Sequence, residues 1–421
     1  MASPKFQALK GTRDILSPES ERMRALVDVF ADECRLAGYG NIMSPIFEDL
    51  GVFLRVGEST DVVTKEMYDF EDKDGRRIAL RPELTASVVR AFVQHSPTNL
   101  PWKAWYEGPQ FRHEKPQAGR YRQFSQVGVE VLGSDDADVD VEVIALGWRF
   151  YERLGMHQVS LLLNSLGDDT CRPAYLAALE AYLRDHESDL SEGSRETLAK
   201  NPLRVLDSKR REDAQIIADA PLMVDHLTAE TAEHFARVRD GLDSLGIPYE
   251  ISPRLVRGLD YYTRTTFEYV SIALENAQNA VGGGGRYDGL AASLGGKPTP
   301  GIGFALGVDR ILLACDAEGV FPGPSTAPDV FIVDLTGGAA AVELTDELRR
   351  AGISADRGFD GRSMKAQMKV ADRSGAPWAI LVGDDEVANA AVTLRDMTGD
   401  TGQTSVSRTD LVNDLQRRLG R

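Results

Sequence analysis

The chain has 421 residues, of which 42% are hydrophobic and 27% charged, and its formal net charge is −17. This length predicts two or three domains, and the composition is that of a globular protein with full cores. The acidic total argues against nucleic-acid binding, although a local basic patch can outweigh it. No stretch of 18 apolar residues exists, so the sequence predicts no membrane span.

The three cysteines, at positions 34, 171 and 315, lie far apart along the chain. This spacing favours reduced thiols in the cytoplasm over a disulfide framework or a zinc site. The six histidines include no HExxH pattern, so we predict no metal site built from protein side chains. The N-terminus, MASPKFQALKGTRD, lacks the apolar segment of a signal peptide, which also favours the cytoplasm.

Apolar residues recur at helical spacing between Pro18 and Gly38, which predicts a helix of about five turns. The next segment, NIMSPIFEDL, has extended character, and Pro45 restricts it to an edge or irregular position. We also expect a short strand at residues 77–80 and a helix at residues 85–95.

Two aromatic and β-branched segments, residues 102–111 and 122–132, predict an antiparallel hairpin around the long polar loop HEKPQAGRY. Gln126, Gly128 and Glu130 alternate along its second strand and therefore share one face. Because a mid-strand glycine costs stability, we interpret this face as a ligand site in which Gly128 leaves room. A solvated sheet face is the alternative.

Residues 157–164 predict another strand, whereas residues 168–245 are alanine-rich, highly charged and helical in pattern. We interpret this second segment as a helical insertion, at residues 169–247. Sheet character returns at residues 255–270 and in the run GGGGRYDG at 282–289. Four consecutive glycines suit a backbone that closely approaches another surface, although a flexible loop is the alternative.

Residues 301–314, which begin GIGFALG, predict a strand that runs into a helix. Their glycines would form a flat floor on which a planar ring could lie, with Arg310 over a phosphate. A plain strand-to-helix joint is the alternative. Neither GIGFALG nor GGGGRYDG matches a dinucleotide fingerprint or a P-loop, so a nucleotide would be held by another device.

Proline, glycine and small polar residues at 319–329 predict a linker. Beyond it, strands and helices alternate as β-α-β-α-β, followed by a strand at residues 391–395 and a helix at residues 408–419. This alternation predicts a separate small α/β domain.

Two arginine-bearing segments, FRHEKPQAGRYRQFSQVGVE (111–130) and LVRGLDYY (255–262), are the most informative part of the chain. The guanidinium group is always charged and binds phosphate or carboxylate bidentately. With the neighbouring glutamates, glutamine and tyrosines, these arginines predict a site for an anionic phosphate compound and a small polar ligand. For Arg257, a surface arginine on an edge strand is the alternative.

Several segments together resemble a known family. GYGNIMSPIFE (38–48), residues 111–130 and residues 301–310 resemble motifs 1, 2 and 3 of class II aminoacyl-tRNA synthetases, in that order. LVRGLDYY and GGGGRYDGL resemble the two signatures of the histidyl-tRNA synthetase family, which KGTRD (10–14) and LRPELTASV (80–88) also match. The resemblance covers essentially the whole chain.

The resemblance implies an α+β catalytic domain on an antiparallel sheet, the class II synthetase fold, at residues 1–325, interrupted by the helical insertion. It also implies a C-terminal α/β anticodon-binding domain with a mixed sheet at residues 329–421. A homodimer with Pro45 in its interface is a further implication.

The same resemblance implies a role for each matching residue. Arg257 and Arg112 would be catalytic, Arg257 by bridging the histidine carboxylate and the ATP α-phosphate, and Arg112 by gripping that phosphate. The residues that would bind histidine are Glu83, Thr85 and Gln126 at its α-ammonium group, Glu130 and Tyr262 at its imidazole, and Tyr261 in the pocket wall. The residues that would bind ATP are Arg112, Glu114, Arg120 and, at the γ-phosphate, Arg310.

The implied activity is the ATP-dependent ligation of L-histidine to tRNA(His) through a histidyl-adenylate, with release of AMP and pyrophosphate. The attacking carboxylate is already ionised, so no general base is needed, and fixed arginines with Mg²⁺ would stabilise the charge that builds on the α-phosphate. The family commonly has RPEGT where this chain has RPELT, so Leu84 replaces a glycine.

Arg362, Lys365, Lys369 and Arg373 recur at three- and four-residue spacing and would form one helix stripe. A solvated face is the bland interpretation, but the resemblance favours contact with tRNA phosphates.

The alternative function is that of a histidine-binding regulatory paralogue of histidine biosynthesis without aminoacylation activity. Such paralogues typically lack the C-terminal domain and the catalytic residues that this chain keeps. A different class II synthetase is disfavoured by the two histidine signatures.

Overall fold

The computed structural model describes residues 6–57, 62–208, 210–255, 261–274, 279–399 and 402–421. The chain divides into two compact units, Met1–Pro324 and Ser325–Arg421. The division falls within the proline- and glycine-rich segment at residues 319–329, where the composition predicts a linker.

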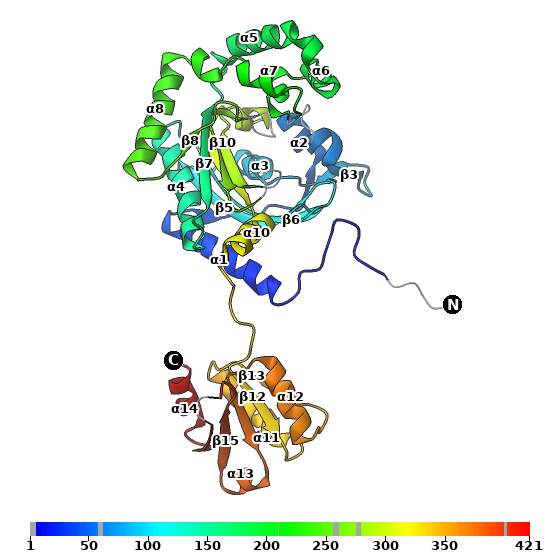
Figure 1. The fold of residues 1–421 in the computed structure, drawn as a ribbon, viewed down its shortest axis with the longest axis vertical. Helices are drawn as coiled ribbons and strands as arrows, with labels where there is room; N and C mark the ends of the chain where they lie inside the picture. The colour runs from blue at the N-terminus through cyan, green and yellow to red at the C-terminus, as the bar shows by residue number, and fades with distance from the viewer. Residues whose placement is uncertain (1–5, 58–61, 209, 256–260, 275–278, 400–401) are drawn as a thin grey trace, which may run out of the picture. The chain divides into compact units, whose positions relative to one another are not determined.

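The first unit is built on an eight-stranded sheet with the order β1-β5-β6-β11-β10-β9-β7-β8 (Figure 1). Its strands are β1 (Gly40–Asn41), β5 (Trp102–Phe111), β6 (Gln123–Leu132), β11 (Gly301–Gly307), β10 (Ala280–Arg286), β9 (Thr263–Ser271), β7 (Val159–Ser165) and β8 (Glu250–Ile251). The pairs at the two edges, β1·β5 and β7·β8, are parallel, and the pairs between them are antiparallel. The predicted antiparallel sheet and the predicted hairpin β5–β6 are confirmed.

Helices α1 (Glu19–Leu36), α4 (Ala137–Arg153) and α10 (Val308–Glu318) share one hydrophobic core with the inner strands, and α8 (Ala229–Ser244) of the insertion adds to it. Helix α4 has no counterpart among the predicted elements. Its Val139, Val141 and Val143 alternate as they would in a strand, which hides the helical period. Asp136 caps the helix, because its side chain accepts a hydrogen bond from the Asp138 backbone N–H at 3.0 Å.

A second core lies among α2 (Leu50–Gly57), α3 (Thr85–His95) and α9 (Leu290–Ser293), and it includes Tyr262 and Tyr287. Beside it, the short strands β2 (Phe47–Asp49), β4 (Arg77–Leu80) and β3 (Tyr68–Glu71) form a small antiparallel sheet, and a single π-helical turn, η1, spans Val62–Glu66. The predicted helix at residues 85–95 and strand at residues 77–80 are confirmed at their bounds.

The segment interpreted as a helical insertion contains helices only, among its described residues. Its α-helices are α5 (Arg172–Asp185), α6 (Glu192–Leu198), α7 (Ala214–Asp219) and α8 (Ala229–Ser244), and its 3₁₀ turns are η2 (Glu187–Asp189), η3 (Pro202–Asp207) and η4 (Met223–His226). Helices α5 to α7 enclose a core of their own, and they lie together in Figure 1. Helix α8 instead places Phe235, Val238 and Leu242 in the core of the main sheet. The insertion is therefore attached in two different ways.

The four-glycine run forms β10, an inner strand of the sheet rather than a surface loop. A Cβ atom at Gly284 would overlap the carbonyl oxygen of Gly303 on the neighbouring strand β11. The backbones of β10 and β11 therefore lie too close for a side chain at this position, which confirms the interpretation as a close approach.

The second unit has a five-stranded mixed sheet with the order β13-β12-β14-β15-β16. Its strands are β12 (Val330–Asp334), β13 (Ala355–Arg357), β14 (Trp378–Val382), β15 (Ala391–Asp396) and β16 (Gln403–Ser407). Its helices are α11 (Ala339–Arg350), α12 (Met364–Ser374), α13 (Asp384–Ala388) and α14 (Leu411–Arg418). The first three strands are parallel and the last two pairings antiparallel, so the predicted mixed sheet is confirmed. The edge strand β16 and the short helix α13 were not predicted.

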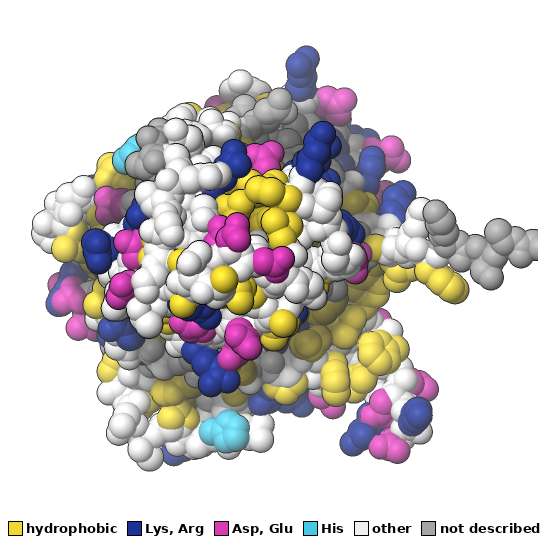
Figure 2. Space-filling view, turned by 90° about the horizontal axis from the view of Figure 1, so that it is seen from below, with side chains coloured by type: hydrophobic (Ala, Val, Ile, Leu, Met, Phe, Trp, Pro, Cys, Tyr) yellow, Lys and Arg dark blue, Asp and Glu magenta, His cyan; other side chains and the backbone are white. Residues whose placement is uncertain are grey.

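Charged side chains of both signs are interspersed on the face shown in Figure 2, and hydrophobic side chains gather in patches between them. Among the described residues, no helix is long and apolar enough to cross a membrane.

Candidate active site

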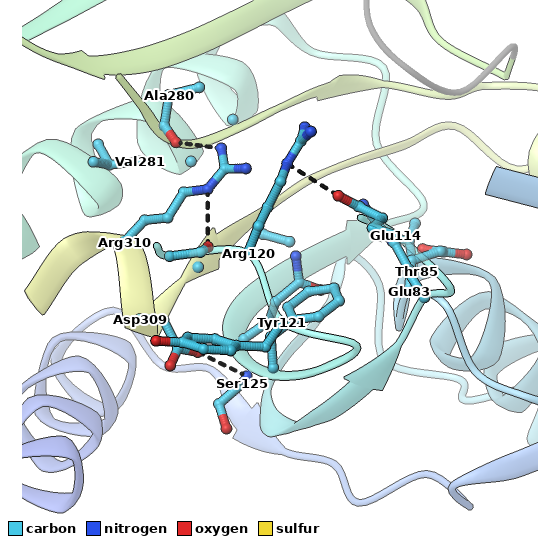
Figure 3. Close-up of a pocket in the computed structure, with 18 of the residues that line it drawn as sticks. Glu83, Thr85, Glu114, Arg120, Tyr121, Ser125, Ala280, Val281, Asp309 and Arg310 are labelled. Atoms are coloured by element: carbon cyan, nitrogen blue, oxygen red, sulfur yellow. Dashed lines mark hydrogen bonds and ion pairs between the residues drawn. The ribbon is translucent and has the colours of Figure 1, made fainter. Parts of the chain in front are cut away.

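A cavity of about 210 Å³ opens over the sheet of the first unit, at the glycine-rich strands β10 and β11 (Figure 3). Of the eleven predicted site residues, ten are described, and all but one of these line this cavity. The nine lining residues are Glu83, Thr85, Arg112, Glu114, Arg120, Gln126, Tyr261, Tyr262 and Arg310. Glu130 is the described exception, and Arg257 lies at residues 256–260, outside the described residues.

Fixed arginines line the cavity. Arg310 donates from Nη1 to the carbonyl of Ala280 at 3.0 Å and from Nε to that of Gly119 at 3.4 Å. Arg112 donates from Nε to the carbonyl of Pro82 at 2.9 Å. Burial, reinforced by the nearby charge of Arg120, lowers the pKa of Arg310 from its ordinary value. Crowded cations of this kind fit an anion such as a polyphosphate.

Carboxylates accompany these arginines. Glu114 lies within the cavity wall with Oε2 at 3.0 Å from Nε of Arg120 and Oε1 at 3.8 Å from Nη1 of Arg112. Figure 3 shows Arg120 and Glu114 reaching toward one another, and Arg310 across the cavity from Glu83 and Thr85.

The cavity wall also offers hydrogen-bond acceptors. Oε1 of Glu83 accepts from the backbone N–H of Ala86 at 2.9 Å. Oε2 of Glu83 and Oε1 of Gln126 are buried and have no hydrogen-bond partner among the described residues. Burial raises the pKa of Glu83 from its ordinary value. Two unpartnered acceptors in the wall of one cavity fit a ligand that carries a protonated amine.

Glu130 lies one hydrogen bond behind the cavity wall and is fully buried. Its Oε1 accepts from Thr85 Oγ1 at 2.7 Å and from the Tyr106 hydroxyl at 3.0 Å, and its Oε2 accepts from the Tyr287 hydroxyl. Burial raises its pKa to about 8, although these hydroxyl groups oppose the shift. Sequence reasoning missed both tyrosines as partners, and for Tyr287 the signal was its place inside GGGGRYDG.

The room that Gly128 was expected to leave for a ligand is occupied by the protein itself. A Cβ atom at Gly128 would overlap the Tyr106 hydroxyl group. The glycine therefore accommodates the tyrosine that holds Glu130, and the prediction of ligand space above Gly128 is wrong.

The predicted glycine floor of β11 is also mostly covered. Side chains fill the space over two of its glycines, Tyr287 over Gly301 and Glu130 over Gly303. Only Gly307 has nothing within 4 Å of an added Cβ, and it lines the cavity. The open floor is thus shorter than the sequence pattern predicts.

Tyr261 and Tyr262 stand together in the cavity wall with their ring centroids 4.7 Å apart. Tyr262 is only 8% exposed, and burial raises the pKa of Tyr261 well above its ordinary value. The phenol of Tyr261 is therefore neutral, and the hydroxyl groups of both tyrosines can serve as hydrogen-bonding groups.

Leu84, which stands where the family commonly has glycine, is buried against Val88, Ala104 and Tyr106. Its φ of −104° is accessible to any residue, so this position does not require glycine. Glu83 and Thr85 on either side both line the cavity.

A buried ion network behind β10 was not predicted. Arg286, beside Tyr287, is fully buried and pairs with Asp140 of α4. Asp140 also lies 2.9 Å from Nε2 of His234 on α8. The network joins the glycine-rich strand, the main core and the last helix of the insertion.

Among the described residues, no three His, Cys, Asp or Glu side chains cluster as a metal site would require. Mg²⁺ is usually bound by one or two carboxylates together with substrate phosphates. Glu114, beside Arg112 and Arg120, is the kind of donor that fits an ion arriving with a nucleotide.

Comparison with known proteins gives the same picture as the fold and the site. The family model of histidyl-tRNA synthetase matches residues 11–311, and that of the anticodon binding domain matches residues 329–418. The histidine–tRNA ligases of Nocardia farcinica and Rhodococcus opacus are each 50% identical over 421 residues, which cover 99% of this chain and 99% and 98% of theirs. An apo histidyl-tRNA synthetase structure from S. aureus has a TM-score of 0.82 at 36% identity, covering 98% of this chain and 100% of that one.

An antiparallel sheet with an arginine-lined cavity, joined to a mixed-sheet domain of the anticodon-binding type, defines a class II aminoacyl-tRNA synthetase. Relatives that are 50% identical to this chain cover both of its units. The chain belongs to the histidyl-tRNA synthetase family. This confirms the predicted family and ligase class, and it disfavours the regulatory paralogue.

Proposed function

We propose that this protein joins L-histidine to tRNA(His) in two steps at this cavity. A carboxylate oxygen of histidine attacks the α-phosphorus of ATP, which forms histidyl-adenylate and releases pyrophosphate. A ribose hydroxyl of the tRNA then attacks the carbonyl carbon of the adenylate, and AMP leaves. The observation that carries the proposal is a single cavity lined both by fixed guanidinium groups and by unpartnered buried acceptors.

On the phosphate side, Arg112 binds the α-phosphate and Arg310 the γ-phosphate, while Glu114 and Arg120 lie over the nucleotide. Backbone carbonyls already hold Arg112 and Arg310 in place, so little reorganisation is needed when negative charge builds in the transition state. Arg257 is proposed as the second catalytic arginine, which bridges the carboxylate and the α-phosphate. Mg²⁺ bound with ATP, and held by Glu114, would add positive charge at the phosphates.

On the amino-acid side, Glu83 and Gln126 accept hydrogen bonds from the α-ammonium group, and Thr85 completes that subsite. Glu130 and Tyr262 distinguish the imidazole, whose ring carries one donor and one acceptor nitrogen. Glu130 lies behind Thr85 and accepts a hydrogen bond from its hydroxyl group, so this contact joins the α-ammonium and imidazole subsites.

The second unit is proposed to bind tRNA through phosphate neutralisation. Lys365, Lys369 and Arg373 are exposed along α12, at helical spacing. Arg362 is exposed too, but it precedes the first residue of α12. The stripe on the helix therefore begins at Lys365 and not, as predicted, at Arg362.

We also propose a cytoplasmic homodimer. The three cysteines are free and buried, which fits a reducing compartment. The segment around Pro45 exposes large apolar side chains, with Met43 86%, Ile46 45% and Phe47 57% exposed. Light scattering of the purified protein should give twice the mass of the chain.

Amino-acid-dependent ATP–pyrophosphate exchange tests the proposed function directly. Histidine alone should support exchange, and the same preparation should then charge tRNA(His). Absence of exchange would favour a regulator, and exchange with threonine, proline or glycine would indicate a different synthetase.

A further inference from the structure

The KGTRD segment at residues 10–14 has no part in the proposed chemistry, yet it packs against the loop at residues 112–122, here named the motif 2 loop. The carbonyl of Gly11 accepts a hydrogen bond from the backbone N–H of Arg122 at 2.7 Å. Gly11 has a φ of +88°, and an added Cβ would lie 2.8 Å from side-chain carbons of both Pro116 and Arg122. Two separate parts of the loop therefore rest on one glycine.

Arg13, two residues further on, contacts three other segments. Its Nη2 lies 2.7 Å from Oε1 of Glu19 in α1 and 3.0 Å from Oδ1 of Asp309 in α10. Its Cζ lies 4.7 Å from the ring centroid of Tyr121 in the motif 2 loop, within cation–π distance. One guanidinium group thus joins the N-terminal segment, α1, the loop and α10.

Two of these partners belong to the cavity wall, although Arg13 itself does not line it. Tyr121 directly follows Arg120, and Asp309 directly precedes Arg310. In Figure 3 the Tyr121 ring lies beside Asp309, which accepts a hydrogen bond from the backbone N–H of Ser125 at 3.4 Å. Arg13 therefore contacts, from outside the cavity, the immediate neighbours of Arg120 and Arg310.

Electrostatic repulsion acts between the same two elements, which the hydrogen bond from Arg310 to the Gly119 carbonyl also joins. Arg120 on the loop and Arg310 on α10 carry like charges close enough for Arg120 to disfavour the charged form of Arg310. Before a nucleotide binds, this repulsion tends to drive the loop away from α10. The contacts of Arg13 with Tyr121 and Asp309 pull the same two elements together.

We propose that Arg13 is a positioning residue that holds the motif 2 loop against α10, so that Arg120 and Arg310 face the same triphosphate. The proposal rests on the proposed function, because it takes this cavity as the ATP site. Loss of Arg13 leaves Asp309 without its cation and Tyr121 without its stacking partner, so the loop departs and ATP binding weakens. The histidine side of the cavity keeps its own contacts.

The test is steady-state ATP–pyrophosphate exchange with full-length Arg13→Gln. We expect the KM for ATP to rise about tenfold, the loss of one charge-assisted contact, while the KM for histidine stays within about twofold. An unchanged KM for ATP overturns the inference, and so does an equal rise for both substrates, which a general loss of stability would produce. If the wild-type protein shows no exchange, it is the proposed function that fails.

Arg22→Gln is the matched control. Arg22 pairs with Asp316 of the same helix α10 and donates to the Phe321 carbonyl at 2.8 Å, but neither partner lines the cavity. Its loss removes a comparable ion pair and should leave the KM for ATP unchanged. A rise equal to that of Arg13→Gln would assign the effect to stability alone.

Two further variants keep the test decisive if Arg13→Gln folds poorly. Arg13→Lys keeps the charge near Asp309 without the planar group over Tyr121, so the KM for ATP should lie between the wild type and Arg13→Gln. Gly11→Ala pushes Pro116 and Arg122 away without altering a charge, and it should raise the KM for ATP in the same direction. Wild-type values for both variants overturn the inference.

Discussion

The cavity of the first unit and the exposed side of α12 are both proposed to bind phosphate groups, and they hold their cations in opposite ways. In the cavity, carbonyl groups fix Arg112 and Arg310 in a low-dielectric wall. On α12, Lys365 and Lys369 extend from one helix face toward solvent. Fixed buried cations suit a transition state whose charge appears at one point, whereas flexible exposed cations suit a long polyanion that must bind and leave.

The largest effect is expected from a substitution of one of the arginines that carbonyl groups fix in the cavity. Arg112→Gln should lower kcat/KM for ATP–pyrophosphate exchange by about 10²–10³-fold, because it removes a positioned charge at the α-phosphate. The melting temperature should change little, since Arg112 lies at the edge of a cavity. A loss of less than about tenfold would show that Arg112 is as dispensable as a surface cation.

Glu83→Gln should act mainly on histidine. The variant keeps the shape of the side chain but loses the charge that faces the α-ammonium group, so the KM for histidine should rise about tenfold to a hundredfold. The KM for ATP, measured in the same assay, serves as the internal control. Equal changes in both would remove Glu83 from the amino-acid subsite.

Glu130, which lies behind the cavity wall, should make the free energy of unfolding depend on pH. With a native pKa of about 8 against an ordinary value of 4.5, Glu130 keeps a proton that the unfolded chain has lost. Its stabilising contribution is complete below about pH 4.5 and falls as pH rises to about 8, by roughly 1.4 kcal/mol per pKa unit at most. Urea unfolding of the wild type and Glu130→Gln from pH 5 to 8 measures this, and the fall should be steeper in the wild type. Parallel pH profiles would contradict it.

Two glycines of the same strand form a matched pair. Gly303→Ala would overlap the Glu130 carboxylate and the Val129 carbonyl, and it should destabilise the protein by about 1–3 kcal/mol. Gly307→Ala meets nothing within 4 Å and should leave stability unchanged while narrowing the nucleotide side of the cavity. Denaturant unfolding with exchange kinetics separates the two, and equal stabilities would contradict the packing argument.

The smallest expected effect lies on α12. Lys369→Ala should raise the KM for tRNA in aminoacylation by less than about fivefold and reduce the salt dependence of tRNA binding by about one unit of slope. Pyrophosphate exchange, which needs no tRNA, should be unaffected. An unchanged salt slope would mean that this face does not meet phosphates.

Periodic elements of this fold could be predicted from the residues alone. The hairpin β5–β6 and helix α3 have strong local patterns, and their bounds agree with the structure to within one residue. Helix α4 could not, because alternating valines imitate a strand until the core decides which faces are buried. Strand β16 could not either, since an exposed polar edge strand has little hydrophobic pattern.

Within the site, the charged residues were predictable and their packing was not. A glycine in a strand shows only that something approaches closely, and the sequence does not say whether that is a ligand or a side chain. At Gly128 it is Tyr106, and at Gly303 it is Glu130. The role proposed for Arg13 likewise depends on contacts between residues about 300 positions apart, which no local pattern contains.

The insertion is attached in two ways, and its helices should therefore differ in how readily they unfold locally. Helices α5 to α7 close around a core of their own, so they can open while the eight-stranded sheet stays intact. Helix α8 cannot, because its His234 contacts Asp140, which in turn pairs with Arg286 of the strand that carries the histidine signature. Hydrogen–deuterium exchange should therefore resolve two populations of amides in one insertion. The amides of α5 to α7 should exchange fast, and those of α8 should exchange slowly.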